Sequence, residues 1–215
     1  MPLNGLVVDW GGVLTVGMHE AMASWAAHES IDISDFVSVM HQWLGPEYAM
    51  EAAINPIHAL EKGELQVPEF ERHLAESLTG RTGRPIAAEG LLDRMFRFFR
   101  HSPDMMALVR RAKTHGIHTA LLSNSWGNDY PQDLFDGMFD VVVISGEVGM
   151  RKPDAEIFHH TLDQLELAAD QCVFVDDLLP NVVAARRLGF VAVHHTDYPT
   201  TAGELDILFD VELSG

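Results

Sequence analysis

The chain has 215 residues, of which 47% are hydrophobic, so it is long enough to bury a core as one domain or as a core with an insert. Its formal net charge of −18 argues against binding to nucleic acid or to anionic membranes, because those surfaces attract Lys and Arg. The lone Cys172 excludes an internal disulfide and fits a reducing compartment.

The N-terminal residues lack the basic start and the apolar stretch of a signal peptide. No run approaches the roughly 18 apolar residues that a membrane span needs. We therefore expect a cytoplasmic protein with no membrane partner. The sequence carries no signal for a particular oligomeric state.

Five continuous apolar runs, each bounded by polar turns, predict the buried strands of a parallel sheet. They lie at residues 6–8, 117–122, 141–144, 173–175 and 190–194. Helical periodicity fills the intervals between the later runs. Strands that alternate with helices in this way predict an α/β fold, in which a Rossmann-like sheet is doubly wound by right-handed crossovers.

The interval between the first and second strands breaks this rhythm. It is about a hundred residues long, far beyond a normal crossover, and it is rich in apolar residues at helical spacing. We predict that residues 16–100 form an inserted α-helical cap domain. The Rossmann-like core then consists of residues 1–15 and 101–215.

Asp9 stands where the first strand ends and two glycines follow. Gly11 and Gly12 remove side chains at a point where the backbone can approach a ligand closely. A carboxylate at such a point can attack phosphorus or ligate a cation. A single Asp at a strand end also caps turns, so Asp9 alone does not decide between these roles.

Polar residues also follow the second predicted strand, and a lysine lies in the loop after the third. Ser123 and Asn124 can donate hydrogen bonds to phosphate oxygens, although both are common turn formers. Lys152 lies in a loop before Pro153, where a compact cation can neutralise a phosphate. A solvated surface lysine is the alternative interpretation.

Two adjacent carboxylates, Asp176 and Asp177, close the fourth strand. Like charges so close together repel each other, and the arrangement destabilises the fold unless a cation offsets it. Acidic residues at a helix N-terminus are the alternative interpretation. Asn181, just beyond, is placed to steady the acidic loop.

Adjacent histidines occur twice, at residues 159–160 and at residues 194–195. Neither pair has the spacing of an HExxH zinc motif, so zinc ligation is not favoured. The sequence also lacks a GxGxxG dinucleotide motif and a Walker loop.

Taken together and in order, four segments resemble the motifs of the haloacid dehalogenase superfamily. They are VVDWGGVL, LLSN, RKPDAEIF and VFVDDLLPNVVAARRLG. The resemblance covers nearly the whole chain, and the stretch HALEKGELQVPEFERHL is similar to members with a helical cap after the first strand.

The resemblance implies a Mg²⁺-dependent hydrolase of small phosphomonoesters, which include sugar phosphates. It makes Asp9 the nucleophile that forms an aspartyl-phosphate. Ser123 and Asn124 would hold the phosphoryl group of a small phosphorylated metabolite, and Lys152 would balance charge during catalysis.

The same resemblance implies a set of Mg²⁺ ligands. Asp9 and Asp177 would be the principal carboxylates, and Asp176 would assist them. The backbone carbonyl of Gly11 would be the remaining protein ligand. This role needs no side chain at that position.

Gly11 is also where the sequence departs from most phosphatases of this family, which carry Asp there as a general acid. General acid catalysis contributes roughly 10²–10⁴-fold to a rate. The departure leaves open a metal-independent 2-haloacid dehalogenase, which also lacks that Asp. It also leaves open a non-catalytic regulatory protein that binds phosphate or metal. The intact pair of Asp176 and Asp177 favours the phosphatase over both.

Four residues are candidates for substrate-facing positions in the active site. They are Trp10, His19, Trp43 and Trp126. For Trp43, which stands at helical spacing, a place in the core of the cap is the favoured alternative.

Overall fold

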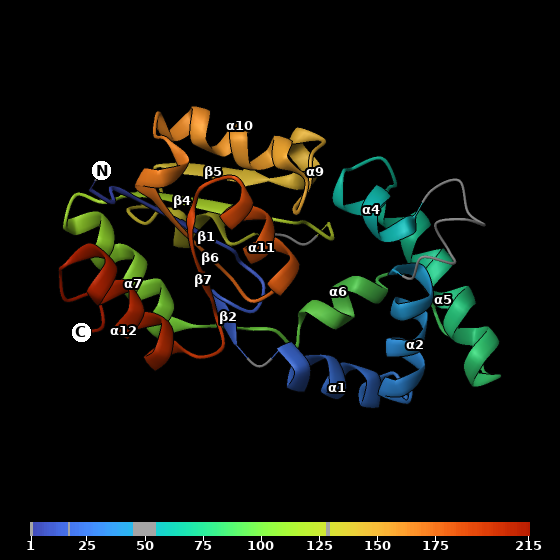
Figure 1. Cartoon of the computed structure of the whole chain (residues 1–215). Helices are drawn as coiled ribbons and strands as arrows, with labels where there is room; N and C mark the ends of the chain where they lie inside the picture. Colours follow the sequence, from blue (N-terminus) through green and yellow to red (C-terminus); the bar gives the residue numbers. More distant parts are fainter. Residues whose placement is uncertain (1, 17, 45–54, 128–129) are drawn as a thin grey trace. The chain divides into compact units, whose positions relative to one another are not determined.

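The computed structural model describes residues 2–16, 18–44, 55–127 and 130–215 (Figure 1). The chain divides into two compact units. The first comprises Met1–Val16, His101–Asn124 and Tyr130–Gly215, and the second comprises Gly17–Arg100 and Ser125–Asp129. Compared with the predicted cap, the second unit starts one residue later and takes in a short additional segment.

A five-stranded sheet forms the centre of the first unit. Its strands are β1 (Gly5–Val8), β4 (His118–Ser123), β5 (Val141–Ile144), β6 (Cys172–Asp176) and β7 (Val191–His194). All neighbours are parallel and the order is β5-β4-β1-β6-β7. The five strand predictions and the Rossmann-like fold class are therefore confirmed, with strand ends that differ by only a few residues.

Helices cover both faces of this sheet. The longer ones are α7 (Pro103–Thr114), α10 (Ala155–Leu165), α11 (Leu179–Arg187) and α12 (Tyr198–Phe209). Two shorter helices, α8 (Gln132–Phe135) and α9 (Ser145–Val148), and the 3-10 turn η1 (Ala169–Gln171) lie in the connections.

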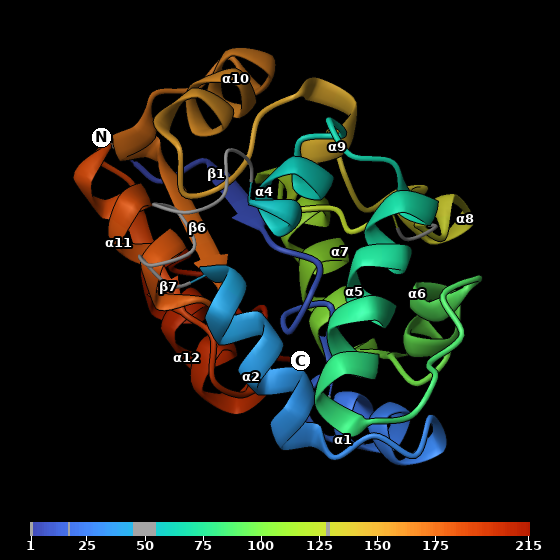
Figure 2. The same ribbon diagram turned by 90° about the vertical axis from the view of Figure 1, so that its right-hand side faces the viewer.

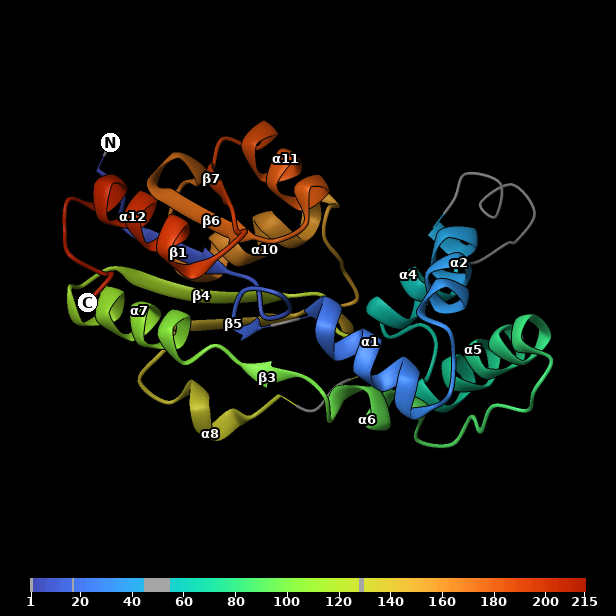
Figure 3. The ribbon, with the colours of Figure 1, turned by 90° about the horizontal axis from the view of Figure 1, so that it is seen from below.

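Successive residues of the central strands point to opposite faces. Leu6 and Val8 belong to the hydrophobic cluster that includes α7 and α12, whereas Val7 belongs to the cluster that includes α10 and α11. Figure 3 shows α7 and α12 side by side along one face. Because both faces are buried, the strands are apolar without alternation, which is why their sequences could be recognised.

The second unit is helical. Its helices are α1 (Met18–His28), α2 (Ile33–Leu44), α4 (Pro56–Glu61), α5 (Val67–Thr82) and α6 (Leu91–Phe96) (Figure 2). Their apolar faces meet in one cluster, in which Trp25 packs on Phe36 and Trp43 packs on Phe70 with ring centroids 5.1 and 5.6 Å apart.

A two-stranded sheet that the sequence did not predict pairs β2 (Thr15–Val16) with β3 (Arg100–His101).

A buried carboxylate helps to hold the second unit together. Glu71, on α5, accepts hydrogen bonds from the backbone amides of Gly90 and Leu92 at 3.1 and 2.9 Å, which satisfies donors at the start of α6. Within the described residues, no helix has both the length and the apolar character that a membrane crossing requires.

Candidate active site

The register of the sheet brings the motif residues to one edge. Val8 pairs with Leu121 on one side and with Val175 on the other, so the residues that follow these strands emerge together. Asp9 follows β1, Ser123 ends β4 and Asp176 ends β6. This carboxyl edge is where open α/β sheets bind ligands.

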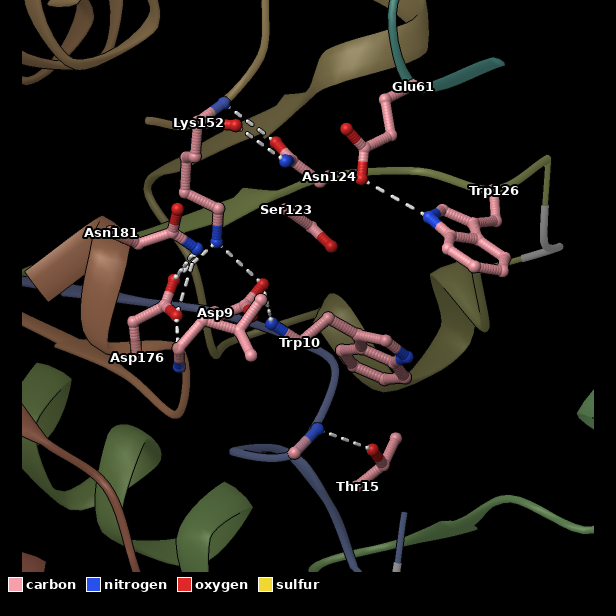
Figure 4. A network of polar contacts seen from close by, with 12 residues as sticks. Asp9, Trp10, Thr15, Glu61, Ser123, Asn124, Trp126, Lys152, Asp176 and Asn181 are labelled. Carbon is pink, nitrogen blue, oxygen red and sulfur yellow. Dashed lines mark hydrogen bonds and ion pairs between the residues drawn. The ribbon is translucent and has the colours of Figure 1, made fainter. Parts of the chain in front are cut away.

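A buried ion cluster lies at the centre of the edge (Figure 4). The Nζ atom of Lys152 is 2.9 Å from Oδ1 of Asp9 and 2.7 Å from Oδ2 of Asp176. Lys152 is only 1% exposed, although it comes from the loop between α9 and α10. The structure therefore places Lys152 in the site rather than in solvent.

Burial changes the pKa values of the charged groups in this cluster. Burial raises the pKa of Asp9 to about 7, with Lys152 opposing the rise and Asp176 adding to it. Burial alone lowers the pKa of Lys152, but Asp176 and Asp9 outweigh it and raise that pKa above its ordinary value. Lys152 is consequently a permanent cation beside a carboxylate whose charge is costly to maintain.

Backbone donors fix the nucleophile candidate. The backbone amide of Trp10 donates to Oδ1 of Asp9 at 2.7 Å, and the amide of Asp9 itself donates to the carbonyl of Val175 at 3.0 Å. Oδ1 thus accepts from both Trp10 and Lys152. Neither of these two contacts involves Oδ2 of Asp9.

Asn124 has a role that the sequence did not predict. Its amide nitrogen donates to the backbone carbonyl of Lys152 at 3.0 Å, and its amide oxygen accepts from the backbone amide of Lys152 at 2.9 Å (Figure 4). This reciprocal pair joins residues 28 positions apart and holds the backbone of the lysine loop. The predicted phosphate contact of Asn124 stays a prediction.

Tyr130 was missed by the sequence analysis. Its hydroxyl lies 2.9 Å from Oγ of Ser123, which is 2% exposed. Its ring also packs on Trp10, with centroids 5.7 Å apart. The short segment around Tyr130 has no apolar periodicity that would have indicated this contact.

Asp176 is held more firmly than its neighbour. Besides Lys152, it accepts hydrogen bonds from the amide of Asn181 at 3.0 and 3.1 Å and from the backbone of Leu178 at 2.8 Å. The predicted steadying role of Asn181 is confirmed by these contacts. Asp176 is fully buried, and its oxygens serve the ion cluster and the start of α11.

Asp177 lies against the glycine pair. A Cβ built on Gly12, whose φ is +75°, would stand 2.2 Å from Oδ2 of Asp177, so only glycine fits there. A Cβ built on Gly11 would meet nothing within 4 Å. Burial raises the pKa of Asp177 to about 6, with the charge of Asp176 adding to the rise.

Carboxylate oxygens of Asp9, Asp176 and Asp177 all lie within 4.8 Å of one another. Such a set of hard oxygen donors is suited to a divalent cation. The structure therefore groups the three carboxylates that the sequence assigned to the metal.

The substrate-selection candidates lie in different surroundings. Trp10 is 7% exposed, and its ring packs on Tyr130, His101 and Phe135. Trp43 is 4% exposed within the hydrophobic cluster of the second unit, and His19 is exposed on α1. Both tryptophans thus pack in the interior of their units, and the substrate contacts of these residues stay predictions.

Trp126 belongs to the second unit, although it follows Asn124 by only two residues. Its Nε1 atom donates to Oε1 of Glu61 at 3.2 Å, and its ring packs on Phe70 with centroids 5.7 Å apart (Figure 4). Gly127, with φ +74°, lies so close to Val67 that a Cβ would stand 2.1 Å from a Val67 methyl group. These contacts anchor the short segment to α4 and α5.

Residues 3–189 match the family of haloacid dehalogenase-like hydrolases. The chain therefore belongs to that family and is an enzyme of the hydrolase class. It is 35% identical over 153 residues to a sesquiterpene phosphatase of Aspergillus oryzae, a match that covers 67% of this chain and 74% of that one. It is also 31% identical over 131 residues to a phosphoserine phosphatase of Thermus thermophilus, covering 58% of this chain and 53% of the relative.

Solved structures share the fold. A predicted HAD-like family hydrolase from Porphyromonas gingivalis has a TM-score of 0.68 at 20% identity, covering 95% of this chain and 98% of that chain. An HAD family enzyme of Bacteroides thetaiotaomicron, in a complex with magnesium and inorganic phosphate, has a TM-score of 0.62 at 17% identity, covering 90% and 94%. These two likenesses bear on the fold alone.

Proposed function

We propose that this hydrolase is a Mg²⁺-dependent phosphomonoesterase that works through an aspartyl-phosphate on Asp9. The buried cluster of Lys152 with Asp9, Asp176 and Asp177 carries the proposal. It combines a nucleophile, a fixed cation and a set of metal donors at one edge of the sheet. The similarity to two phosphatases supports it further.

The donor set fits Mg²⁺. Three carboxylates within 4.8 Å of one another carry more negative charge than Lys152 alone can offset. Burial raises the pKa values of Asp9 and Asp177, and the charge of Asp176 adds to both rises. We assign Asp9, Asp177 and the Gly11 carbonyl as the principal protein ligands, with Asp176 assisting. Bound Mg²⁺ would supply positive charge that favours the ionised carboxylates and neutralises phosphoryl oxygens.

In the first step, Oδ2 of Asp9 attacks phosphorus, the bond from phosphorus to the ester oxygen breaks, and the departing oxygen takes a proton from solvent. Lys152 and the amide of Trp10 hold Oδ1 so that Oδ2 faces the phosphoryl group. In the second step, water attacks phosphorus and the bond to Asp9 breaks, which releases inorganic phosphate and restores the carboxylate.

Lys152 acts by charge and position. Its Nζ atom is buried and remains protonated, so it needs no reorganisation when negative charge moves onto the phosphoryl oxygens. Asn124 holds the backbone of Lys152 through its two hydrogen bonds. We assign Ser123, and the main chain that follows it, to the phosphoryl oxygens.

Gly11 has no acidic side chain that could protonate the leaving alcohol. Phosphate esters with good leaving groups, such as an aryl phosphate, are therefore expected to turn over faster than alkyl esters such as sugar phosphates. The relative from Aspergillus oryzae is a sesquiterpene phosphatase, so terpenyl phosphates belong in the same comparison.

Restoring an acid at this position gives a sharp prediction. Gly11→Asp should raise the turnover of alkyl phosphates, by up to about 10²-fold, because a carboxyl group there can protonate the leaving oxygen and nothing within 4 Å obstructs its Cβ. Steady-state phosphate release from paired aryl and alkyl esters measures the effect. Gly11→Ala is the steric control and should give no such gain.

The neighbouring glycine provides a second control. Gly12→Ala places a methyl group against Asp177 and should lower activity on both classes of ester. If Gly11→Asp leaves the ratio of alkyl to aryl turnover unchanged, the missing acid does not limit the native enzyme.

The proposal as a whole is tested by a panel of phosphomonoesters assayed with Mg²⁺ and with EDTA. We expect phosphate release with Mg²⁺ and its loss with EDTA. Halide release from 2-haloacids in EDTA, with no phosphate release, would instead assign a metal-independent dehalogenase. The pair of Asp176 and Asp177 disfavours that outcome. Lys152 and Asn181 already account for Asp176, whereas a second carboxylate beside it repels it and gives no benefit to an enzyme that binds no cation.

A further inference from the structure

The mechanism leaves the pair His194 and His195 without a role. His194 is the last residue of β7, and the register of the sheet pairs it with Asp176. β7 lies directly beside β6 (Figure 1), so this histidine stands next to the acidic pair that ends β6.

The two histidines make different contacts. Nε2 of His194 is 2.9 Å from the backbone carbonyl of Asp177, whereas Nδ1 of His195 is 2.8 Å from the hydroxyl of Thr201 on α12. A carbonyl oxygen only accepts, so Nε2 of His194 carries the proton in its contact. The side chain of His194 is therefore held at the acidic loop, and the side chain of His195 is held at α12.

Asp177 depends on its backbone more than Asp176 does. The carboxylate of Asp176 is held by Lys152 and by the amide of Asn181. The carboxylate of Asp177 lies in the partly buried space beside Gly12. The direction of that carboxylate follows the backbone that carries it, and the contact from His194 fixes this backbone at its carbonyl.

We propose that His194 is a positioning residue, which holds the loop after β6 so that the carboxylate of Asp177 faces the cation site. The inference rests on the proposed function, because it assumes a cation at Asp177. A hydrogen bond that orients a metal ligand acts on affinity, since a displaced ligand must be pulled into place when the metal binds. Loss of a hydrogen bond to the ligating group itself weakens metal binding by about 10–100-fold. The contact from His194 acts one step further away, through the backbone of Asp177.

The test measures Mg²⁺ binding by calorimetry for the full chain. His194→Ala should weaken Mg²⁺ binding by about tenfold, the lower end of that range, because the side chain is exposed. His194→Gln should recover most of the affinity, since its terminal amide can donate to the same carbonyl. His195→Ala is the matched control and should bind Mg²⁺ like the wild type.

Kinetics provides a second readout. In His194→Ala, the Mg²⁺ concentration needed for half-maximal phosphate release should rise about tenfold, while kcat at saturating Mg²⁺ stays within about twofold of the wild type. A general loss of structure would instead lower the rate of phosphate release at every Mg²⁺ concentration, including saturation. Equal Mg²⁺ affinity in the wild type and His194→Ala would overturn the proposal, as would an equal loss in His195→Ala.

Different outcomes of these experiments would contradict the proposed function itself. Absence of Mg²⁺ binding by the wild-type protein, or equal binding by wild type and Asp177→Ala, would remove the metal site itself. Mg²⁺ binding that depends on Asp177 but not on His194 would leave the phosphatase proposal intact and reject only the role of His194.

Discussion

Replacing Asp9 by asparagine should lower phosphate release by at least about 10³-fold, because an amide is a poor nucleophile and the aspartyl-phosphate cannot form. The change is nearly isosteric, so the packing around Trp10 and Lys152 should persist. Stopped-flow or steady-state phosphate release with an activated aryl ester and saturating Mg²⁺ measures the loss.

The matched control is Asp163→Asn, which makes the same chemical change on the exposed face of α10 and should leave turnover unaltered. A quenched-flow experiment with labelled substrate should trap phosphate on the wild-type protein and none on Asp9→Asn. Turnover by Asp9→Asn within about tenfold of the wild-type rate would show that another group attacks phosphorus.

The second large effect concerns stability. Lys152→Met keeps an unbranched side chain of similar length but leaves Asp9 and Asp176 buried without their cation. Removing one partner of a buried ion pair typically lowers the free energy of unfolding by about 3–5 kcal/mol. We expect about 3 kcal/mol here, near the lower limit of that range, because Asp9 can take up a proton when its cation is removed. Urea unfolding in EDTA measures the change.

Lys113→Met is the control for this experiment. Lys113 pairs with Asp140 at 2.9 Å, but both side chains are about one-third exposed, so the loss should stay below about 1 kcal/mol. Equal losses for the two variants would mean that the cluster around Lys152 contributes no more than a surface ion pair. Lys152→Met should also reduce phosphate release by about 10²-fold or more, since it removes a preorganised charge.

The sequence was most informative where burial is complete. Both faces of the sheet are covered, so strands such as β1 and β6 are continuous apolar runs, and Asp9 and Asp176 stand at their ends. The buried position of Lys152 was less evident locally, because a lysine in a loop is usually solvated. The ordered set of motifs was the signal that identified it.

Contacts between distant residues were harder to predict. The pairing of Asn124 with the backbone of Lys152, and of Ser123 with Tyr130, depends on how loops from separate strands meet. Periodicity reports which face of an element is buried, but it does not report the direction of a side chain in a loop. For the same reason the sequence did not predict that the ring of Trp10 packs against three others in the first unit. Its contact with a substrate stays a prediction.

The segment that carries Trp126 limits how this enzyme can be shortened. Because Ser125–Asp129 belongs to the helical unit, the polypeptide passes between the two units at four places and not at the two that a simple insertion requires. A shortened chain that joins residue 16 directly to residue 101 would lack Glu61 and Phe70 and leave the indole of Trp126 without either contact. Removing the helical unit therefore requires a replacement for the loop after Asn124 as well.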